Sequence, residues 1–345
     1  MVRATGARPS WSQPEHGMPV PAPLVATARH LWHCQWQRLM DGLAAAGPEG
    51  DFLRRPSQFS DGIDAVDPQA LEAPRLVVGR SCPWAHRLWL LRSLRGLETT
   101  LALTIAEPDP AGGRWLLPEP LHGCHTLAQL YRRGGGDRRR RATVPLLVSD
   151  GGDGLRLIGN DSAALLPLLD RWPAERPSLE PPGRPAAERE LSRLWAERLQ
   201  HQVNDGVYRC GFARTQAAYT RAATALFTTL EALEQHLTTG GPWIAGDWPS
   251  LADVRLFPTL IRWEAVYGPL FGCSRRPLWS FPALWRWRAR FHALPGVAET
   301  CWPDAWRRDY FGALFPLHPS GLVPEGPDLA RLVAAEPPDA ATMTP

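Results

Sequence analysis

Lysine is absent from this sequence of 345 residues, so all 38 basic residues are arginine. Cysteine is scarce, and its six residues show neither the paired spacing of metal ligands nor the density of a disulfide framework. We therefore expect no metal site and a reducing, cytoplasmic environment. The net charge is only +3, which argues against a nucleic-acid partner.

Long apolar runs are also missing. No stretch of 18 apolar residues occurs, so the sequence predicts no membrane span and no membrane partner. The first residues lack the basic and then apolar pattern of a secretory signal, so we do not expect secretion. Apolar residues nevertheless make up 44% of the chain, with 36 prolines and 16 tryptophans. This is a globular composition, long enough for two domains with extensions.

Shifts in composition divide the chain into parts. Residues 1–28 are rich in Pro, Gly and Ala and are expected to be mobile, whereas 30–46 predict a helix whose apolar stripe packs. Residues 47–74 predict an irregular arm, and the Pro-rich end from 323 predicts a loose tail. The expected parts are an N-terminal extension at 1–74, partly disordered, a first domain at 75–172, a linker at 173–187, a helical domain at 188–324 and a tail at 325–345.

Cys82 is the strongest candidate nucleophile. Residues 75–80 predict a short buried strand and 84–96 an amphipathic helix, with Pro83 at the first helical position. Cys82 is then the N-cap residue, where free backbone N–H groups and the helix dipole lower a thiol pKa from ~8.5 toward ~3.5–7.5. The alternative is a small buried hydrophobic residue. Residue 85 is Ala, so a Cys-x-x-Cys partner is missing and a small-molecule thiol would have to resolve a disulfide.

The elements around Cys82 predict a thioredoxin-like domain. A second strand is expected at 99–107, followed by a long interruption at 108–142, two strands at 143–148 and 155–159, and a helix at 161–172. In this plan a cis proline before the third strand lies opposite the cysteine, and Pro145 after Val144 suits that position. A proline that merely starts an edge strand is the alternative.

Asp161 and Ser162 open the last helix of this domain. Both are common N-cap residues, and capping is one interpretation. The other is a ligand site, because a helix N-terminus with a hydroxyl binds a carboxylate and Asp161 could hold an ammonium group. A γ-glutamyl group carries both charges.

The chain after the linker is expected to be helical, at about 187–204, 214–238, 250–266 and 281–293. Ser250 and Asp253 form a variant capping box at the start of the third of these helices. The sequence therefore predicts an α/β domain followed by an all-α domain.

Several motifs together carry a resemblance. They are Ser-Cys-Pro-Trp-Ala-His-Arg at 81–87, Thr-Val-Pro at 143–145, the Asp-Ser pair at 161–162 and the stretches at 204–213, 252–267, 296–300, 307–311 and 318–324. Over roughly 75–327 the chain resembles a glutathione transferase, and most closely the glutathionyl-hydroquinone reductases, the xi class. The resemblance implies a thioredoxin-like N-terminal domain, a helical glutathione-transferase C-terminal domain and a homodimer.

The resemblance also implies roles for individual residues. Cys82 corresponds to the family's nucleophile, and glutathione is implied as co-substrate. The implied glutathione contacts are Trp115, Arg141, Ala142, Thr143, Val144, Pro145, Asp161 and Ser162. The tyrosines implied on the hydroquinone side are Tyr208, Tyr267 and Tyr310. The sequence departs from the family at Asp161, where glutamate is usual, at Phe311, where tyrosine is usual, and at His318, where asparagine is usual.

These residues imply a reaction on glutathionylated hydroquinones. The Cys82 thiolate would attack the glutathionyl sulfur, Tyr208 would protonate the ring carbon that leaves, and a second glutathione would release glutathione disulfide. Two alternatives stay open. One is an omega-like thioltransferase or dehydroascorbate reductase that uses the cysteine without the tyrosines. The other is a binding protein of the same fold without catalysis.

Overall fold

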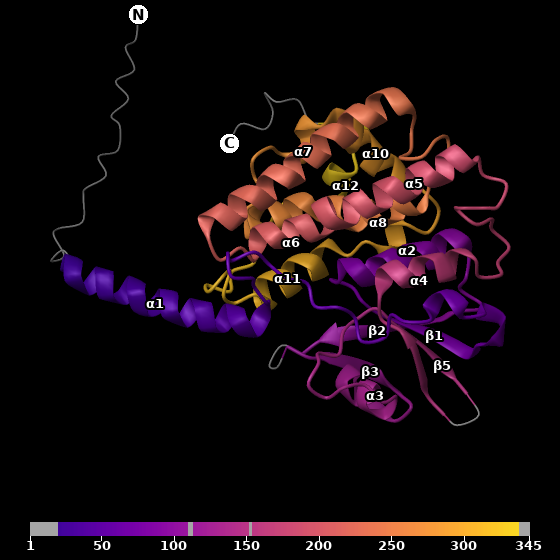
Figure 1. Cartoon of the computed structure of the whole chain (residues 1–345), viewed down its shortest axis with the longest axis horizontal. Helices are drawn as coiled ribbons and strands as arrows, with labels where there is room; N and C mark the ends of the chain where they lie inside the picture. Colours follow the sequence, from indigo (N-terminus) through magenta and orange to yellow (C-terminus); the bar gives the residue numbers. More distant parts are fainter. Residues whose placement is uncertain (1–19, 110–112, 152–153, 338–345) are drawn as a thin grey trace, which may run out of the picture. The chain divides into compact units, whose positions relative to one another are not determined.

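The computed structural model describes residues 20–109, 113–151 and 154–337 (Figure 1). The chain forms two compact units, at residues 1–43 and 44–345. The first unit contains one helix, α1 (Ala22–Leu43), longer at its start than the predicted 30–46. Of the segment expected to be mobile, residues 1–19 lie outside the described part and 22–28 are helical. Leu31, Trp32 and Leu39 are exposed and Met40 is buried, so only part of the expected apolar stripe packs.

The second unit is built on one six-stranded sheet with the order β4-β3-β2-β1-β5-β6. Strand β1 (Glu72–Gly79) runs parallel to β2 (Ala102–Pro108) and antiparallel to β5 (Leu146–Asp150), which pairs with β6 (Arg156–Gly159). Helix α2 (Pro83–Arg95) joins β1 to β2, and α4 (Ser162–Asp170) follows β6. This arrangement confirms the predicted thioredoxin-like plan.

The expected interruption at 108–142 was wrong in part, because it contains regular structure. It holds strands β3 (Trp115–Leu121) and β4 (Cys124–Thr126) and helix α3 (Leu127–Arg133), and β3 extends the sheet beyond β2. Only one of the seven residues of β3 is buried, and two are proline. A strand with so few buried residues lacks the apolar alternation that reveals strands in a sequence.

The rest of the unit is helical and lies against α2 and α4 (Figure 1). Helix α2 ends at Gly96, which has a left-handed conformation. Because α2 packs on α8, the two domains meet through α2. Long buried aromatic side chains, among them Trp263, Trp287 and Trp306, fill the helical core. The helices are α5 (Ala186–Leu199), α6 (Asp205–Gly211), α7 (Gln216–Gly240), α8 (Leu251–Leu260), α9 (Gly268–Phe271), α10 (Pro282–His292), α11 (Pro303–Ala313) and α12 (Leu329–Leu332).

Short helical turns complete the described chain. Two are π-helical, η3 (Gln200–Asn204) and η4 (Trp263–Tyr267), and continue α5 and α8. The 3-10 turns are η1 (Ile63–Ala65), η2 (Pro68–Ala70), η5 (Leu278–Ser280) and η6 (Ala298–Thr300).

The predicted capping box at the start of α8 is present and buried. Asp253 Oδ2 accepts hydrogen bonds from the backbone N–H and the hydroxyl of Ser250, at 2.8 and 2.6 Å. Its Oδ1 accepts from Trp287 Nε1 at 2.7 Å and from the Ile244 N–H at 3.1 Å. Burial raises the pKa of Asp253 above its ordinary value. One carboxylate therefore ties the start of α8 to α10 and to the loop before it.

Residues 44–71, here called the strap, are irregular as expected but packed. The strap's Gly50 carbonyl accepts from the Arg214 N–H at 2.9 Å, between α6 and α7. Further along, Phe59 and Asn160 exchange two hydrogen bonds, at 2.9 and 3.0 Å. Arg171 then donates to three strap carbonyls, those of Ile63, Asp64 and Val66. The strap therefore crosses from the helical domain to the thioredoxin-like domain.

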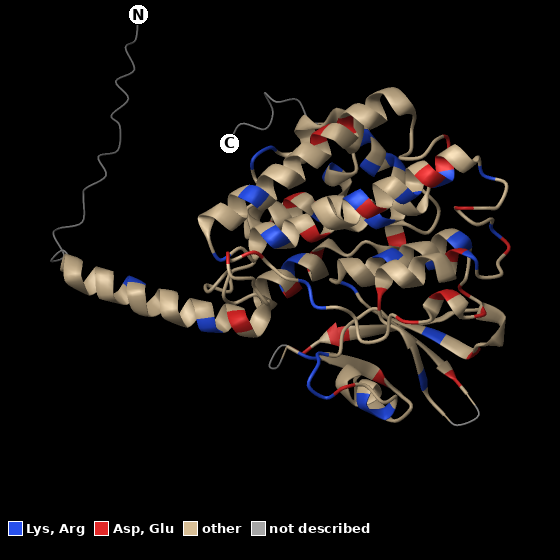
Figure 2. Ribbon diagram, viewed as in Figure 1, with Lys and Arg blue, Asp and Glu red and all other residues tan. Residues whose placement is uncertain are grey.

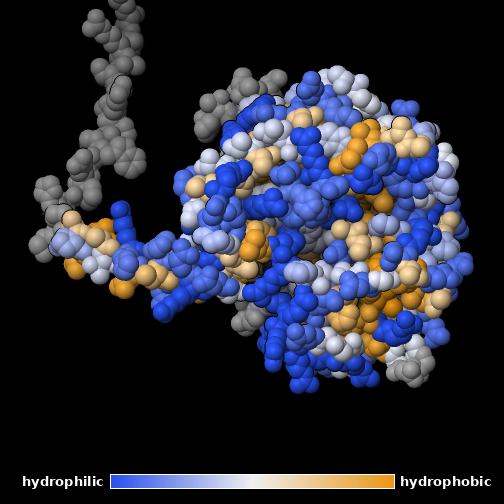
Figure 3. All heavy atoms as spheres, viewed as in Figure 1, coloured by the Kyte–Doolittle hydropathy of each residue, from blue (hydrophilic) through white to orange (hydrophobic). Residues whose placement is uncertain are grey.

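The end of the described chain also packs, although we expected a loose tail. Leu332 of α12 is buried, and Trp285 Nε1 of α10 donates to the Ala334 carbonyl at 2.8 Å. Residues 338–345 of that tail lie outside the described part. Arginine and acidic residues alternate along the helices (Figure 2), and the face seen in Figure 3 is largely hydrophilic with scattered hydrophobic patches. No helix among the described residues is long and apolar enough to cross a membrane.

Candidate active site

Cys82 lies at the N-cap of α2, as predicted. Its backbone is extended, with φ −76° and ψ 115°, and Pro83 occupies the first helical position. The thiol donates to the Val144 carbonyl, with 3.4 Å between Sγ and the oxygen. The Val144–Pro145 peptide bond is cis, which confirms the prediction for Pro145. Residues from two separate segments therefore meet at the carboxyl end of β1.

Burial raises the pKa of the Cys82 thiol above its ordinary value, so the prediction of a lowered pKa was wrong. The backbone N–H groups of Ala85 and Trp84 do lower this pKa, as the N-cap position predicts, and so do the charges of Arg262 and Arg54. Desolvation by burial exceeds these effects, because it disfavours the charged thiolate.

Trp115, the first residue of β3, lies beside the cysteine turn. Its ring packs directly on Gly79, the last residue of β1, three residues before Cys82. A Cβ atom at Gly79 would lie 2.5 Å from this ring, so only glycine leaves room for it. The structure therefore brings Trp115 next to the turn that carries Cys82.

Residues 141–143 precede the cis bond, and Thr143 is hydrogen-bonded to residues of other elements. The Tyr131 hydroxyl donates to the Thr143 carbonyl at 2.8 Å. Asn160 Nδ2 in turn donates to the Tyr131 hydroxyl at 3.0 Å and lies 3.4 Å from Thr143 Oγ1. The side chain of Arg141 is exposed, and that of Ala142 is partly so. Sequence reasoning missed Tyr131 and Asn160, whose contacts span different elements.

Asp161 and Ser162 begin α4, as expected. The Asp161 carboxylate caps the helix, because Oδ1 accepts from the N–H groups of Ala163 and Ala164 at 2.8 and 3.1 Å. Ser162 is buried, and its hydroxyl accepts from Arg87 Nη1 of α2 at 3.4 Å. Capping is therefore one role of Asp161, and the pair faces the same helix that begins after Cys82.

Tyr208, Tyr267 and Tyr310 form one cluster, although they come from three separate elements. The hydroxyl oxygens of Tyr208 and Tyr310 are 2.6 Å apart, and those of Tyr267 and Tyr310 are 3.4 Å apart. The ring of Tyr208 lies 5.7 Å, between centroids, from that of Trp84, two residues after Cys82. The three tyrosines therefore lie together on the helical-domain side of the cysteine turn.

Burial raises the pKa of all three tyrosines, and that of Tyr208 and Tyr310 well above the ordinary value. Negative charge on Cys82 raises the pKa of Tyr208 and Tyr267 further. All three hydroxyls therefore remain protonated at neutral pH. The cluster can donate protons or hydrogen bonds, and it cannot act as a base.

The two π-helical turns explain how the helices present these tyrosines. The turn η3 comes directly before α6, which carries Tyr208, and η4 ends at Tyr267. A π turn inserts one residue and rotates the side chains that follow, and such turns are frequent at functional sites. Apolar periodicity in the sequence does not reveal them.

The strap adds two residues to the site that sequence reasoning missed. The guanidinium carbon of Arg54 lies 4.1 Å from the ring centroid of Trp84 and 5.2 Å from that of Tyr208. Arg54 also forms an ion pair with Asp205, at the start of α6. Phe52 packs its ring 6.4 Å from Tyr208. The signal in the sequence was weak, since Phe52 and Arg54 stand two residues apart in a polar arm.

His86 is a structural residue and lies outside the core of the site. Its Nδ1 accepts from Arg262 at 2.9 Å, so Nε2 carries the proton and lies 2.8 Å from Thr300 Oγ1. Burial and the Arg262 charge hold the pKa of His86 well below its usual range. The imidazole is therefore neutral and does not exchange protons at neutral pH.

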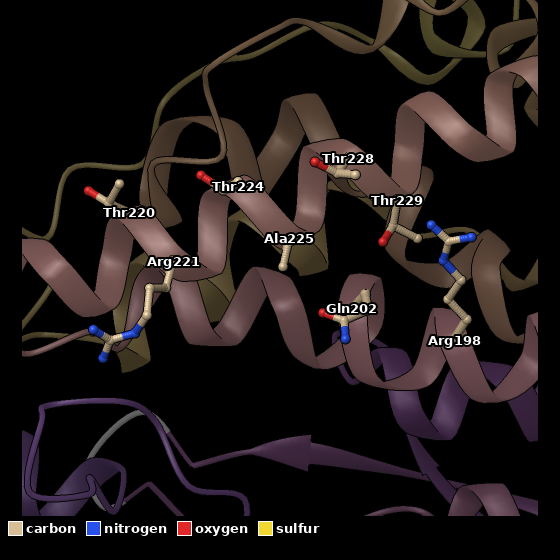
Figure 4. A pocket seen from close by; sticks show the side chains of 8 residues that line it. All are labelled: Arg198, Gln202, Thr220, Arg221, Thr224, Ala225, Thr228 and Thr229. Atoms are coloured by element: carbon tan, nitrogen blue, oxygen red, sulfur yellow. The ribbon is translucent and has the colours of Figure 1, made fainter.

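An open groove elsewhere on the helical domain has none of this chemistry. It lies between α7 and the end of α5, and Figure 4 shows its lining of arginine, glutamine, alanine and threonine side chains. No group of three or more His, Cys, Asp and Glu in the described part of the chain is placed to hold a metal ion. The candidate site is therefore the cysteine turn with its tyrosine cluster.

Comparisons with known proteins agree with this geometry. Two family models match, "Glutathione S-transferase, N-terminal domain" over residues 81–172 and "Glutathione S-transferase, C-terminal domain" over 216–299. Glutathionyl-hydroquinone reductase PcpF of Sphingobium chlorophenolicum is 34% identical, over 81% of this chain and 90% of that protein. The chain belongs to the glutathionyl-hydroquinone reductase family.

Other members of the glutathionyl-hydroquinone reductase family and of the xi class extend the match. Glutathionyl-hydroquinone reductase YqjG of Escherichia coli is 30% identical over 86% of this chain and 93% of that protein. The xi glutathione transferase of Phanerochaete chrysosporium superposes with a TM-score of 0.72 at 27% identity, covering 82% of this chain and 95% of that one. A glutathione-bound structure of YqjG superposes with a TM-score of 0.67 at 28% identity, covering 76% and 86%. This reductase is therefore an oxidoreductase of the glutathione transferase superfamily, and the predicted fold class is confirmed.

Proposed function

We propose that this reductase converts glutathionyl-hydroquinones to hydroquinones with glutathione as co-substrate. The observation that carries the proposal is the cluster of three protonated tyrosine hydroxyls beside a cysteine at a helix N-terminus. Thiol exchange alone needs the cysteine and a glutathione site. A ring carbon that leaves as a carbanion also needs a proton donor, and the cluster provides one.

The first step breaks the carbon–sulfur bond of the substrate. The Cys82 thiolate attacks the glutathionyl sulfur, a disulfide forms between Cys82 and glutathione, and the electron pair of the broken bond moves to the ring carbon. Tyr208 donates the proton that this carbon takes up, and Tyr310, 2.6 Å away, can pass a proton to Tyr208 in turn. The ring is thereby reduced by two electrons, and the two sulfur atoms are oxidised to a disulfide.

The second step restores the thiol. A second glutathione, as its thiolate, attacks the mixed disulfide and leaves as glutathione disulfide, so the Cys82 thiolate is released. A raised thiol pKa does not prevent this chemistry, since the nucleophilicity of a thiolate increases with its pKa. The five described cysteines besides Cys82 are all free thiols.

We assign the glutathionyl group to the region between the cis bond and the start of α4. The Val144 backbone faces the Cys82 sulfur, and Trp115 and residues 141–143 flank it. The N-terminus of α4 suits a carboxylate, because the helix dipole carries partial positive charge there and Ser162 adds a hydroxyl. Asp161 is the acidic partner for the α-ammonium group.

The proposal is tested by incubating the purified enzyme with a glutathionyl-hydroquinone and glutathione. We expect hydroquinone and glutathione disulfide to form in equal amounts, and Cys82→Ser to abolish both. The runner-up, an omega-like thioltransferase, has support in the omega-like relative from Schizosaccharomyces pombe, which is 28% identical. Reduction of hydroxyethyl disulfide without any ring dethiolation would favour it and contradict the proposal.

A further inference from the structure

Arg262 is a buried cation without an anionic partner. It has no exposed surface, and it follows α8 at the start of the π turn that leads to Tyr267. Its Nη1 donates to His86 Nδ1 and to the Pro258 carbonyl, both at 2.9 Å, and its Nη2 to the Arg80 carbonyl at 3.3 Å. No carboxylate in the described part of the chain lies within ion-pair distance of it.

A second arginine in the same domain shows that such isolation is not required by the fold. Arg288 is equally buried, and its guanidinium carbon lies 4.2 Å from the Trp285 ring centroid. Arg288 has its anion, because Glu264 Oε2 accepts from it at 2.7 Å. Arg262 stacks in the same way on Trp306, at 4.2 Å, but finds only neutral acceptors. An unpaired buried charge is destabilising, so an anion that could pair with Arg262 has to be sought nearby.

The hydrogen bonds of Arg262 hold its guanidinium group against the turn that carries Cys82. Arg80 lies two residues before Cys82 and His86 four residues after it, so the guanidinium joins the two ends of the cysteine turn. The His86 N–H donates to the Cys82 carbonyl at 3.0 Å, which closes the first turn of α2 over this clamp. Trp306 Nε1 donates to the same Arg80 carbonyl at 3.1 Å.

The same residue is joined to the tyrosine side of the site. Its backbone carbonyl accepts from the Tyr267 N–H at 3.3 Å, and Trp306 and Tyr310 are one turn apart on α11. Arg262 therefore contacts both the cysteine turn and the segment that carries Tyr267. Neither of them provides a carboxylate that pairs with it.

We infer that Arg262 is the counter-cation of the Cys82 thiolate, a positioning residue whose charge the protein leaves unpaired because the anionic sulfur compensates for it. This inference rests on the proposed function, in which that thiolate is the nucleophile. Its charge lowers the pKa of Cys82, Tyr267 and Tyr310, and so favours an anion in the site.

The other charged or titratable groups that face the thiol have different properties. Arg54 lowers the pKa of Cys82 as well, but it is paired with Asp205 and its side chain is 39% exposed. Tyr208 and Tyr267 are neutral, as is His86. On the far side of Arg262, Cys301 is a thiol, since burial raises its pKa to about 12. Arg262 is therefore the one fully buried cation among these groups.

The test compares variants that keep or remove this charge. The pKa of Cys82 is measured from the pH dependence of iodoacetamide alkylation, with mass spectrometry of the Cys82 peptide to exclude exposed Cys34. We expect Arg262→Gln to raise the Cys82 pKa by about one unit, with alkylation about tenfold slower at neutral pH, and Arg262→Lys to stay near the parent value. Arg288→Gln is the matched control, and its Cys82 pKa should not move even where stability falls.

Each result decides the inference. An unchanged pKa in Arg262→Gln would overturn it. A rise in Arg262→Lys equal to that in Arg262→Gln would also overturn it, because the clamp and not the charge would then matter. Should the neutral variants not fold, Arg262→Lys alone still tests the expectation of an unchanged pKa. The proposed function fails separately, when the parent enzyme forms no Cys82 mixed disulfide with glutathione.

Discussion

Tyr208 is the residue whose hydroxyl separates ring reduction from simple thiol exchange. Its pKa is raised well above the ordinary value by burial, so it holds its proton at neutral pH. We expect Tyr208→Phe to slow ring dethiolation by ~10²–10⁴, since a positioned general acid contributes a factor of this size. Reduction of hydroxyethyl disulfide should be nearly unchanged.

Tyr219→Phe is the control for this variant. The Tyr219 hydroxyl donates to the Gly272 carbonyl at 2.6 Å, outside the cluster. Equal losses of both activities in Tyr208→Phe, or a similar loss in Tyr219→Phe, would speak against a proton donor at residue 208.

The pH dependence of Cys82 alkylation shows which of two opposing effects on the thiol pKa is larger, burial or the N-cap position. Burial raises the thiol pKa, so the thiolate forms at higher pH than in an exposed cysteine. We expect the alkylation rate to rise about tenfold per pH unit from pH 6 to 8, in proportion to the thiolate fraction. A rate that is flat above pH 6.5 would show that the N-cap dominates.

Local sequence was sufficient for part of the site at this scale. The position of Cys82 at the N-cap follows from neighbouring residues and the cis bond at Pro145 from the predicted thioredoxin-like plan, and both are observed. The direction of the thiol pKa shift does not follow from local sequence, because the burial that raises it arises only in the folded chain. Arg262 was missed for the same reason.

At the scale of elements, Asp253 is the residue on which the helical domain depends most. It accepts four hydrogen bonds from Ser250, Ile244 and Trp287, all of them buried. Asp253→Ala leaves these donors without acceptors, so we expect a loss of about 4 kcal/mol in the free energy of unfolding. Urea denaturation followed by circular dichroism measures it.

An exposed acid provides the comparison. Glu190 pairs with Arg193 on the surface of α5, and Glu190→Ala should leave the urea midpoint nearly unchanged. A midpoint in Asp253→Ala that matches this control would contradict the role given to the buried carboxylate.

The positions of helices and strands were predicted correctly where one face of the element is buried and the other exposed, and less well elsewhere. The amphipathic helices α7 and α10 and the buried strand β1 lie close to their expected positions. Strand β3 was missed because only one of its seven residues is buried. The π turns were missed because they break the 3.6-residue period on which helix prediction rests.

At the scale of the molecule, the strap brings residues that precede the thioredoxin-like domain into the site. Residues 1–43 form a separate unit, whereas 44–71 supply Phe52 and Arg54. We expect deletion of 1–43 to leave the melting temperature and the alkylation of Cys82 nearly unchanged. Deletion of 1–71 should lower the melting temperature and increase the exposure of Trp84.

Tryptophan fluorescence and differential scanning calorimetry of the two truncated proteins distinguish these outcomes. A deletion of 1–71 that behaves like a deletion of 1–43 would mean that the strap does not support the site. The sequence showed an irregular arm but not its path, because side chains without periodic spacing hold it to both domains.

In the proposed mechanism, Cys82 carries the glutathionyl group between substrate and glutathione. Intact-protein mass spectrometry during a single turnover, with a glutathionyl-hydroquinone and no free glutathione, tests it most directly. We predict one glutathionyl adduct per chain, located on the Cys82 peptide, formed as hydroquinone is released and removed by added glutathione. Hydroquinone release without an adduct on Cys82, or an adduct on another cysteine that supports turnover, would contradict the account.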